Sequence, residues 1–304
     1  MAVGIVGLLV ATISWGCVFH IAKPMLVEVD AFWQTAIRFS GAAILLLALL
    51  AVIEGPRALR LDGRARLATV FGALGYAGFN FLVFFGLNFT KAEHGAIIVG
   101  MMPILLALVG WFAYRQRPGR VTLGCIALAF GGIVLVITRG SPAALAADSQ
   151  AAIGDMFAVV GVLSYAVYTF GIQRFTGWSP LRFAALTMLM AQPVLFAVLG
   201  LASIAGYAHM PSLAVIGANA PGLLFQIVFA TTAATLGWNL GIAALGPLIG
   251  VLFINLVPIT AFTVGMIRGN RFVAAELIGA AAVIAALLMN NLHARSAMAK
   301  APAK

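Results

Sequence analysis

The sequence predicts an all-α integral membrane protein with ten transmembrane helices, arranged as two inverted five-helix repeats around a central cavity. Of the 304 residues, 63% are hydrophobic and only 9% are charged, whereas a soluble globular protein is about 45–50% apolar. The apolar runs divide into ten segments of roughly 20 residues, the length that crosses the hydrocarbon of a bilayer. One stretch of the first half also recurs in the second half.

The recurring stretch occupies residues 95–110 and 250–265. Each copy reads glycine, seven residues, Pro-Ile, four residues and Val-Gly, and every match lies at an offset of 155. A proline in an ordinary helix interior costs about 3 kcal/mol, but neighbouring helices can satisfy the freed carbonyl inside a membrane. Paired interrupted spans are typical of transporter binding sites. We therefore predict that Pro103 and Pro258 are hinges lining a transport path; the alternative is that both helices merely pack the bundle after a gene duplication.

The first repeat is expected to occupy residues 1–138, and residues 139–151, rich in Ala and Ser, join it to the second. The expected spans of the first repeat are 2–21, 32–53, 67–89, 95–110 and 121–137.

The second repeat is expected over residues 152–293, followed by a basic cytoplasmic tail over 294–304. Ser164-Tyr165-Ala166 matches Ser14-Trp15-Gly16 at an offset of 150, and Gly237-Trp238-Asn239 matches Gly78-Phe79-Asn80 at an offset of 159. Because five is an odd number of spans, the second repeat enters the membrane inverted. Its expected spans are 152–172, 183–204, 223–245, 250–265 and 275–292.

The charge distribution predicts that both termini are cytoplasmic. Twelve basic residues then lie on the inner side and five on the outer side, as the positive-inside rule requires. Arg268 and Arg271 are the exceptions that weaken this assignment. The net charge of +10 comes from short clusters between apolar runs, so it indicates topology and not a nucleic-acid partner.

No enzyme centre, cofactor or metal site is predicted. Cys17 and Cys125 fall inside spans, and the sequence has neither a HExxH motif nor a phosphate-binding glycine loop. The acids Asp155 and Glu276 lie near span ends and none lies at a midplane, so an acid-based proton relay is not visible. His20 and His94 are expected at the membrane interface.

Polar and aromatic side chains at mid-depth are the candidate substrate-binding residues. An asparagine can donate to a carboxylate and accept from an ammonium group, which suits a zwitterion; the alternative is an interhelical hydrogen bond worth about 0.6 kcal/mol. Aromatic rings can equally be core residues. Arg38 could bind a substrate carboxylate, snorkel, or pair with carbonyls or with Glu28 and Asp30. The full set is Trp15, Arg38, Tyr76, Phe79, Asn80, Tyr165, Tyr168, Trp238 and Asn239.

These features together resemble the drug/metabolite transporter superfamily, in its EamA-type exporter branch. The resemblance rests on the ten spans, the inverted repeat, the Trp-Gly of the first span, Arg38 in the second, and the proline-bearing fourth and ninth spans. It implies a basket of the first, third, fourth, sixth, eighth and ninth helices around a central cavity.

The resemblance further implies a secondary transporter that exports amino acids, among them aromatic ones, across the bacterial inner membrane by alternating access. The partners are then a small-molecule substrate and the lipid bilayer. Alternatives are an exporter of other small organic solutes or drugs, and a non-transporting membrane enzyme or structural component. The sequence leaves open the exact substrate, the coupling to protons and the oligomeric state, for which a monomer is compatible.

Overall fold

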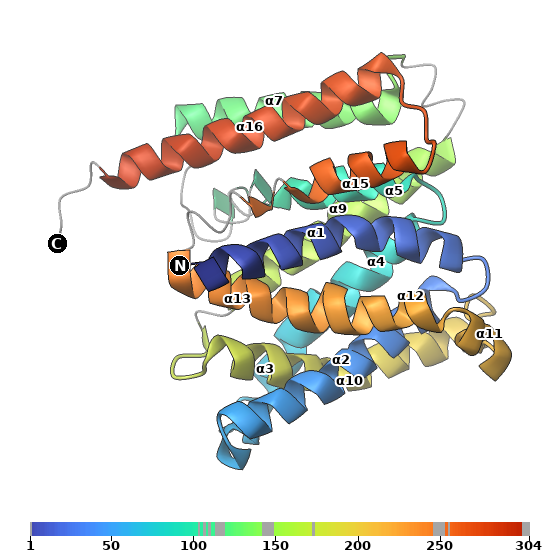
Figure 1. The fold of residues 1–304 in the computed structure, drawn as a ribbon, viewed down its shortest axis with the longest axis vertical. Helices are drawn as coiled ribbons and strands as arrows, with labels where there is room; N and C mark the ends of the chain where they lie inside the picture. The colour runs from blue at the N-terminus through green and yellow to red at the C-terminus, as the bar shows by residue number, and fades with distance from the viewer. Residues whose placement is uncertain are drawn as a thin grey trace.

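The computed structural model describes residues 2–102, 104–105, 108, 111–112, 119–141, 149–171, 174–245, 253–254 and 256–299. All regular secondary structure in these residues is helical (Figure 1). The all-α prediction is therefore confirmed for the described part of the chain.

The first half contains long helices joined by short turns. Asp30 caps the second of them, because its carboxylate accepts hydrogen bonds from the backbone N–H groups of Phe32 and Trp33. The elements are α1 (Ala2–Met25), α2 (Ala31–Ile53), η1 (Pro56–Leu59), α3 (Ala65–Gly72), η2 (Ala73–Gly78), α4 (Phe79–Gly86), α5 (Ala92–Gly100) and α7 (Arg120–Thr138).

The second half is built in the same way. Ser179 caps α10 by accepting from the backbone N–H of Arg182, with Pro180 at the first helical position, where proline fits best. The elements are α9 (Ser149–Gly171), α10 (Pro180–Ile204), α11 (Leu213–Ala218), α12 (Ala220–Leu224), η4 (Phe225–Ala233), α13 (Ala234–Leu245), α15 (Leu256–Ile267) and α16 (Ala274–Ala299).

Six helical runs among the described residues are long and apolar enough to span a bilayer, and shorter apolar helices accompany them. The predicted first span ends at residue 21, but α1 continues to Met25. Likewise α16 continues to Ala299, into the expected tail, because residues 294–299 are mostly helix formers. The chain is thus a multi-pass membrane protein, while the ten-span inverted repeat remains a prediction.

The third and eighth predicted spans both contain a π-helical segment. In the third span this is η2, which leads directly into α4; in the eighth it is η4, which leads into α13. Such segments are rare and often lie at functional sites, since they displace backbone groups from the regular helical ladder. Both segments lie in the helices that carry the matched asparagine motifs.

Glycines bring two pairs of helices into close contact. A Cβ atom on Gly7 of α1 would lie 2.6 Å from the carbonyl oxygen of Gly237 of α13. A Cβ atom on Gly86 of α4 would lie 2.5 Å from the carbonyl oxygen of Gly154 of α9. Small residues at such crossings allow membrane helices to pack backbone against backbone. These crossings bring α1 against α13 and α4 against α9.

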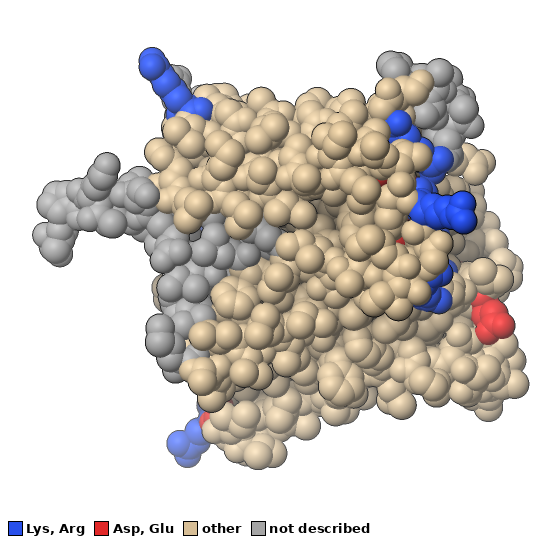
Figure 2. Space-filling view, turned by 45° about the horizontal axis from the view of Figure 1, so that its top comes forward, with Lys and Arg blue, Asp and Glu red and all other residues tan. Residues whose placement is uncertain are grey.

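On the face shown in Figure 2, the charged residues gather toward the two ends of the bundle and leave a broad uncharged surface between them. Helix α1 begins and α16 ends at the same end, on the left in Figure 1. We call this the terminal end, and we call the other end, where α1 ends and α5 begins, the distal end.

Candidate functional site

Arg38 lies on α2 in the interior of the bundle, with only 6% of its surface exposed. Its Nε donates to Thr231 Oγ1 at 2.6 Å and its Nη2 to the carbonyl oxygen of Ala230 at 3.2 Å, both on η4. Its Nη1 donates to Asn80 Oδ1 at 3.4 Å. The guanidinium therefore joins α2, η4 and α4 through neutral acceptors.

Glu28 and Asp30, the acids considered as partners of Arg38, make other contacts. Glu28 accepts from Asn219 Nδ2 at 2.6 Å, and Asp30 caps α2 and accepts from the backbone N–H of His209. Among the described residues, Arg38 forms no ion pair with a carboxylate. The rings of Phe39 and Phe84 flank its guanidinium carbon at 5.1 and 5.5 Å, within the range of a cation–π contact.

Asn80 links Arg38 to the π-helical segment of the third predicted span. Its Oδ1 accepts from Arg38, and its Nδ2 donates to the carbonyl oxygen of Tyr76 at 3.1 Å. Its sequence counterpart Asn239 belongs to α13, but its side chain lies outside the described residues. The pairing of the two asparagines across the site stays a prediction.

Three tyrosines predicted for the site are in mutual contact. The hydroxyl groups of Tyr76 and Tyr168 share a hydrogen bond of 2.8 Å. The ring of Tyr165 lies 5.2 Å from that of Tyr168 and 5.1 Å from that of Phe79, centre to centre. Rings at these separations interact favourably beyond their burial, so residues from the third and sixth predicted spans form one aromatic cluster.

Trp15 and Trp238 form a second aromatic contact, from α1 and α13. Their ring centres are 5.4 Å apart. The indole Nε1 of Trp15 donates to the carbonyl oxygen of Ala230 at 3.0 Å, the same oxygen that accepts from Arg38. Ala230 and Thr231 are functional candidates that sequence reasoning missed. Ala230 acts through a backbone carbonyl, which has no signature in the sequence, and Thr231 acts through its side-chain Oγ1.

The predicted hinges are only partly described. Pro103 lies outside the described residues. Pro258 is buried near the start of α15, and a Cβ atom on Gly100 of α5 would lie 3.2 Å from its ring. The two repeated stretches therefore touch each other in the bundle, and their hinge function stays a prediction.

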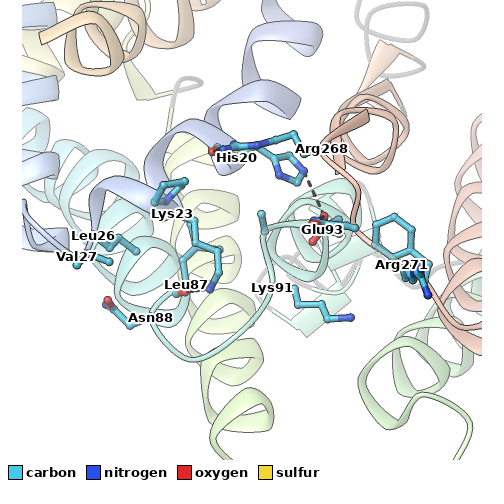
Figure 3. Close-up of a pocket in the computed structure, with 14 residues that line it drawn as sticks. His20, Lys23, Leu26, Val27, Leu87, Asn88, Lys91, Glu93, Arg268 and Arg271 are labelled. Carbon is cyan, nitrogen blue, oxygen red and sulfur yellow. Dashed lines mark hydrogen bonds and ion pairs between the residues drawn. The ribbon is translucent and has the colours of Figure 1, made fainter. Parts of the chain in front are cut away.

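A pocket of about 790 Å³ opens at the distal end, lined by residues of the segments 20–27, 87–93 and 268–272 (Figure 3). None of the predicted substrate-binding residues lines it. Lys23 Nζ donates to the carbonyl oxygens of Leu87, at 2.6 Å, and of Thr90. Arg268 Nη1 donates to the carbonyl oxygen of His20 at 2.6 Å. Two of the basic residues of this pocket, Lys23 and Arg268, are therefore held in place by backbone oxygens.

The side chains of His20 and His94 are buried inside the protein, near the end of α1 and the start of α5, and their expected place at the membrane interface stays a prediction. His20 Nε2 is 3.5 Å from Glu93 Oε1. His94 Nδ1 is 3.3 Å from Asp155 Oδ2, and its Nε2 is 3.6 Å from Glu276 Oε1. Glu93, Asp155 and Glu276 come from three helices that meet at the distal end, and their carboxylates provide polar surroundings for the buried rings. His20 Nε2 is also 2.7 Å from the carbonyl oxygen of Ala261.

The buried acids are further satisfied by neighbouring donors. Lys91 Nζ donates to Glu276 Oε1 at 2.6 Å, and Thr90 Oγ1 donates to Asp155 Oδ1 at 2.7 Å. Glu93 Oε1 accepts from Asn270 Nδ2 at 2.7 Å. These contacts tie the N-terminal end of α5 to α9, to α16 and to the turn after α15.

Comparison with known proteins supplies the class of activity. The model of the EamA-like transporter family matches residues 2–138. The chain is 33% identical to the uncharacterized transporter YrdR of Bacillus subtilis over 96% of its own length and 92% of that protein's length. It is 31% identical to the uncharacterized transporter YyaM of Bacillus subtilis, over 91% of this chain and 90% of that protein.

A solved crystal structure shares the fold. It superposes with a TM-score of 0.65 at 20% sequence identity and covers 97% of each chain. The likeness to the two transporters extends over nearly the whole chain, and the family model covers the half that carries Trp15 and Arg38. The chain therefore belongs to the EamA-like transporter family.

Proposed function

We propose that this protein is a secondary transporter that exports amino acids, chiefly neutral and aromatic ones, across the bacterial inner membrane by alternating access. In this proposal both termini lie in the cytoplasm and the distal end faces outward. Membership of the EamA-like transporter family supports transport of a small solute. The choice of amino acids rests on the central side chains.

The buried guanidinium of Arg38 carries this choice. A buried charge is costly unless a counter-charge and hydrogen bonds compensate it. Among the described residues, Arg38 donates hydrogen bonds to neutral acceptors and pairs with no carboxylate. A solute carboxylate would supply the missing charge, and guanidinium groups bind carboxylates in a planar, two-pronged geometry.

The surrounding rings suit an apolar or aromatic side chain. Trp15, Trp238, Phe79 and Tyr165 are partly buried and lie near the Ala230 carbonyl or within the tyrosine cluster. Sites for small organic molecules combine apolar and aromatic walls with a few placed polar groups. A neutral amino acid with a bulky side chain presents both kinds of surface.

The test replaces the neutral neighbour of Arg38 by a charged one of the same shape. Asn80→Asp places a carboxylate oxygen where Asn80 Oδ1 now lies, 3.4 Å from Arg38 Nη1. If Arg38 binds the carboxylate of the solute, the new carboxylate at position 80 takes its place. The thermal stability of the protein then rises, and counterflow of labelled L-phenylalanine in proteoliposomes is abolished. A purely structural Arg38 predicts higher stability with unchanged counterflow, which would overturn the proposal.

Two further arms identify the solute class and the direction. Phenethylamine lacks the carboxylate and 3-phenylpropionate lacks the ammonium group, so neither is expected to exchange as fast as L-phenylalanine. Preferential counterflow of phenethylamine would favour an exporter of organic cations or drugs. Uptake of L-phenylalanine into inside-out membrane vesicles measures export directly, and uptake only by right-side-out cells would reverse the direction.

A further inference from the structure

The pocket at the distal end concentrates positive charge. Lys23, Lys91, Arg268 and Arg271 line it, against the single carboxylate of Glu93 (Figure 3). Clefts lined by one sign of charge focus the electric field and raise the local concentration of oppositely charged solutes. This pocket therefore attracts anionic groups.

These cations come from three separate parts of the chain that the fold brings together. Lys23 lies in the last turn of α1, Lys91 precedes α5, and Arg268 and Arg271 follow α15. Two of them are fixed by carbonyl oxygens, and Lys91 is fixed by Glu276. Among the described residues, the exposed side chain of Arg271 makes no hydrogen bond or ion pair, which leaves its guanidinium able to bind a solute.

The pocket also contains an acid and a ring in positions that suit the rest of an amino acid. Glu93 Oε1 accepts from Asn270 Nδ2 and lies 3.5 Å from His20 Nε2, whereas Glu93 Oε2 makes no hydrogen bond within the described part of the chain. The ring of Phe272 forms part of the wall and is steadied by Phe262, with ring centres 4.7 Å apart. Cations, one carboxylate and an aromatic wall complement a carboxylate, an ammonium group and an apolar side chain, respectively.

We propose that this pocket is a second binding site, for a zwitterionic amino acid with an apolar side chain, separate from the site around Arg38. The proposal rests on the proposed function for the identity of the solute. It also accounts for Arg268 and Arg271, which run against the charge asymmetry of the loops: they serve a binding site and not membrane orientation. In the proposed topology the distal end faces outward, so an exported amino acid would occupy this pocket last, before it is released outside the cell.

Lysine labelling tests the pocket without requiring transport. The chain has four lysines, of which Lys23 and Lys91 line the pocket and Lys300 and Lys304 lie in the tail. The Lys91 side chain is 35% exposed, so an acylating reagent can reach it. The purified protein in nanodiscs of neutral lipid is labelled with and without L-phenylalanine, and each lysine is quantified by mass spectrometry. Lys300 and Lys304 correct for reagent consumed by the amino acid.

Bound L-phenylalanine is expected to slow the labelling of Lys91, relative to Lys300 and Lys304, about fivefold at about four times the dissociation constant. 3-Phenylpropionate, which keeps the carboxylate, protects more weakly, and phenethylamine does not protect. Arg271→Gln weakens the apparent affinity about fivefold, the effect of one exposed charge pair. The matched variant Arg57→Gln, exposed and remote from the pocket, leaves it unchanged.

Other results overturn the proposal. If saturating L-phenylalanine leaves the labelling rate of Lys91 unchanged, the pocket does not bind the amino acid. Protection that appears only when phosphatidylglycerol is added to the nanodiscs makes the pocket a lipid headgroup site. Protection that is lost in Arg38→Gln but kept in Arg271→Gln assigns the binding to the central site alone. Protection without any counterflow keeps the pocket and rejects the transport proposal, so the two failures are distinguishable.

Discussion

Trp15 and Arg38 donate hydrogen bonds to the same backbone oxygen, the carbonyl of Ala230 in η4, at 3.0 and 3.2 Å. Two helices of the first half are thereby joined at one atom of the second half. A π-helical segment that shifts between states would move both side chains together. Through this shared acceptor, the position of η4 in the second half is coupled to the positions of Trp15 and Arg38 in the first half.

The first prediction concerns the other acceptor of Arg38 on η4. Thr231→Val removes the oxygen that accepts from Arg38 Nε, leaving a buried donor unpaired at a cost of about 1–3 kcal/mol. We expect a lower thermal stability and a loss of L-phenylalanine counterflow. Thr232→Val is the matched control, because Thr232 Oγ1 donates to the carbonyl of Ile227 and does not touch Arg38. Equal effects of the two variants would contradict a special role for Thr231.

The second prediction concerns the matched asparagines. Asn80→Ala and Asn239→Ala are expected to insert and purify like the parent. Their affinity for the amino acid is expected to fall about 5- to 150-fold, because one polar group of the substrate loses its partner, and transport is lost with it. Phe79→Ala and Trp238→Ala are expected to impair transport of bulky apolar amino acids more than that of alanine. Counterflow of several amino acids is the measurement. Loss confined to protein yield would make these residues structural.

The third prediction concerns the two prolines. Pro103→Ala and Pro258→Ala restore a backbone donor and are expected to stiffen their helices, giving a folded protein with slower transport. Alternating access in such folds is largely the rocking of one repeat against the other. Initial rates in proteoliposomes, compared with equilibrium binding of L-phenylalanine, separate slower motion from weaker binding. Normal rates for both variants would make the prolines packing features.

The fourth prediction concerns topology. Reporter fusions after Gly63 and after Arg117 are both expected to report the cytoplasm, because each position lies within a basic loop. A fusion after Gly269, at the distal end, is expected to report the periplasm. A periplasmic signal at Gly63 or Arg117 would contradict the inverted-repeat model and would also turn the cationic pocket toward the cytoplasm.

Several site residues could be predicted from the sequence because helical periodicity and internal matching place them at similar depths. Arg38 and Asn80 do meet, as do Tyr76 and Tyr168, and Trp15 and Trp238. Depth follows from position within an apolar run, since each residue advances a helix by about 1.5 Å. The membrane class follows equally directly from composition and the length of the apolar runs.

The sequence by itself thus determined the all-helical membrane class and pointed to several of the side chains that meet in the interior of the bundle. Only the tertiary structure decided which helices meet. The crossing of α1 and α13 at Gly7 and Gly237 brings Trp15 to the carbonyl of Ala230, and the meeting of α1 with α5 buries His20 beside Glu93. Hydrophobic periodicity shows which face of a helix is buried but not which other helix packs against that face. A backbone carbonyl is present at every residue, so the sequence does not show which one accepts a hydrogen bond. The pocket of Lys23 and Arg271 likewise exists only because segments far apart in the chain converge at one end of the bundle.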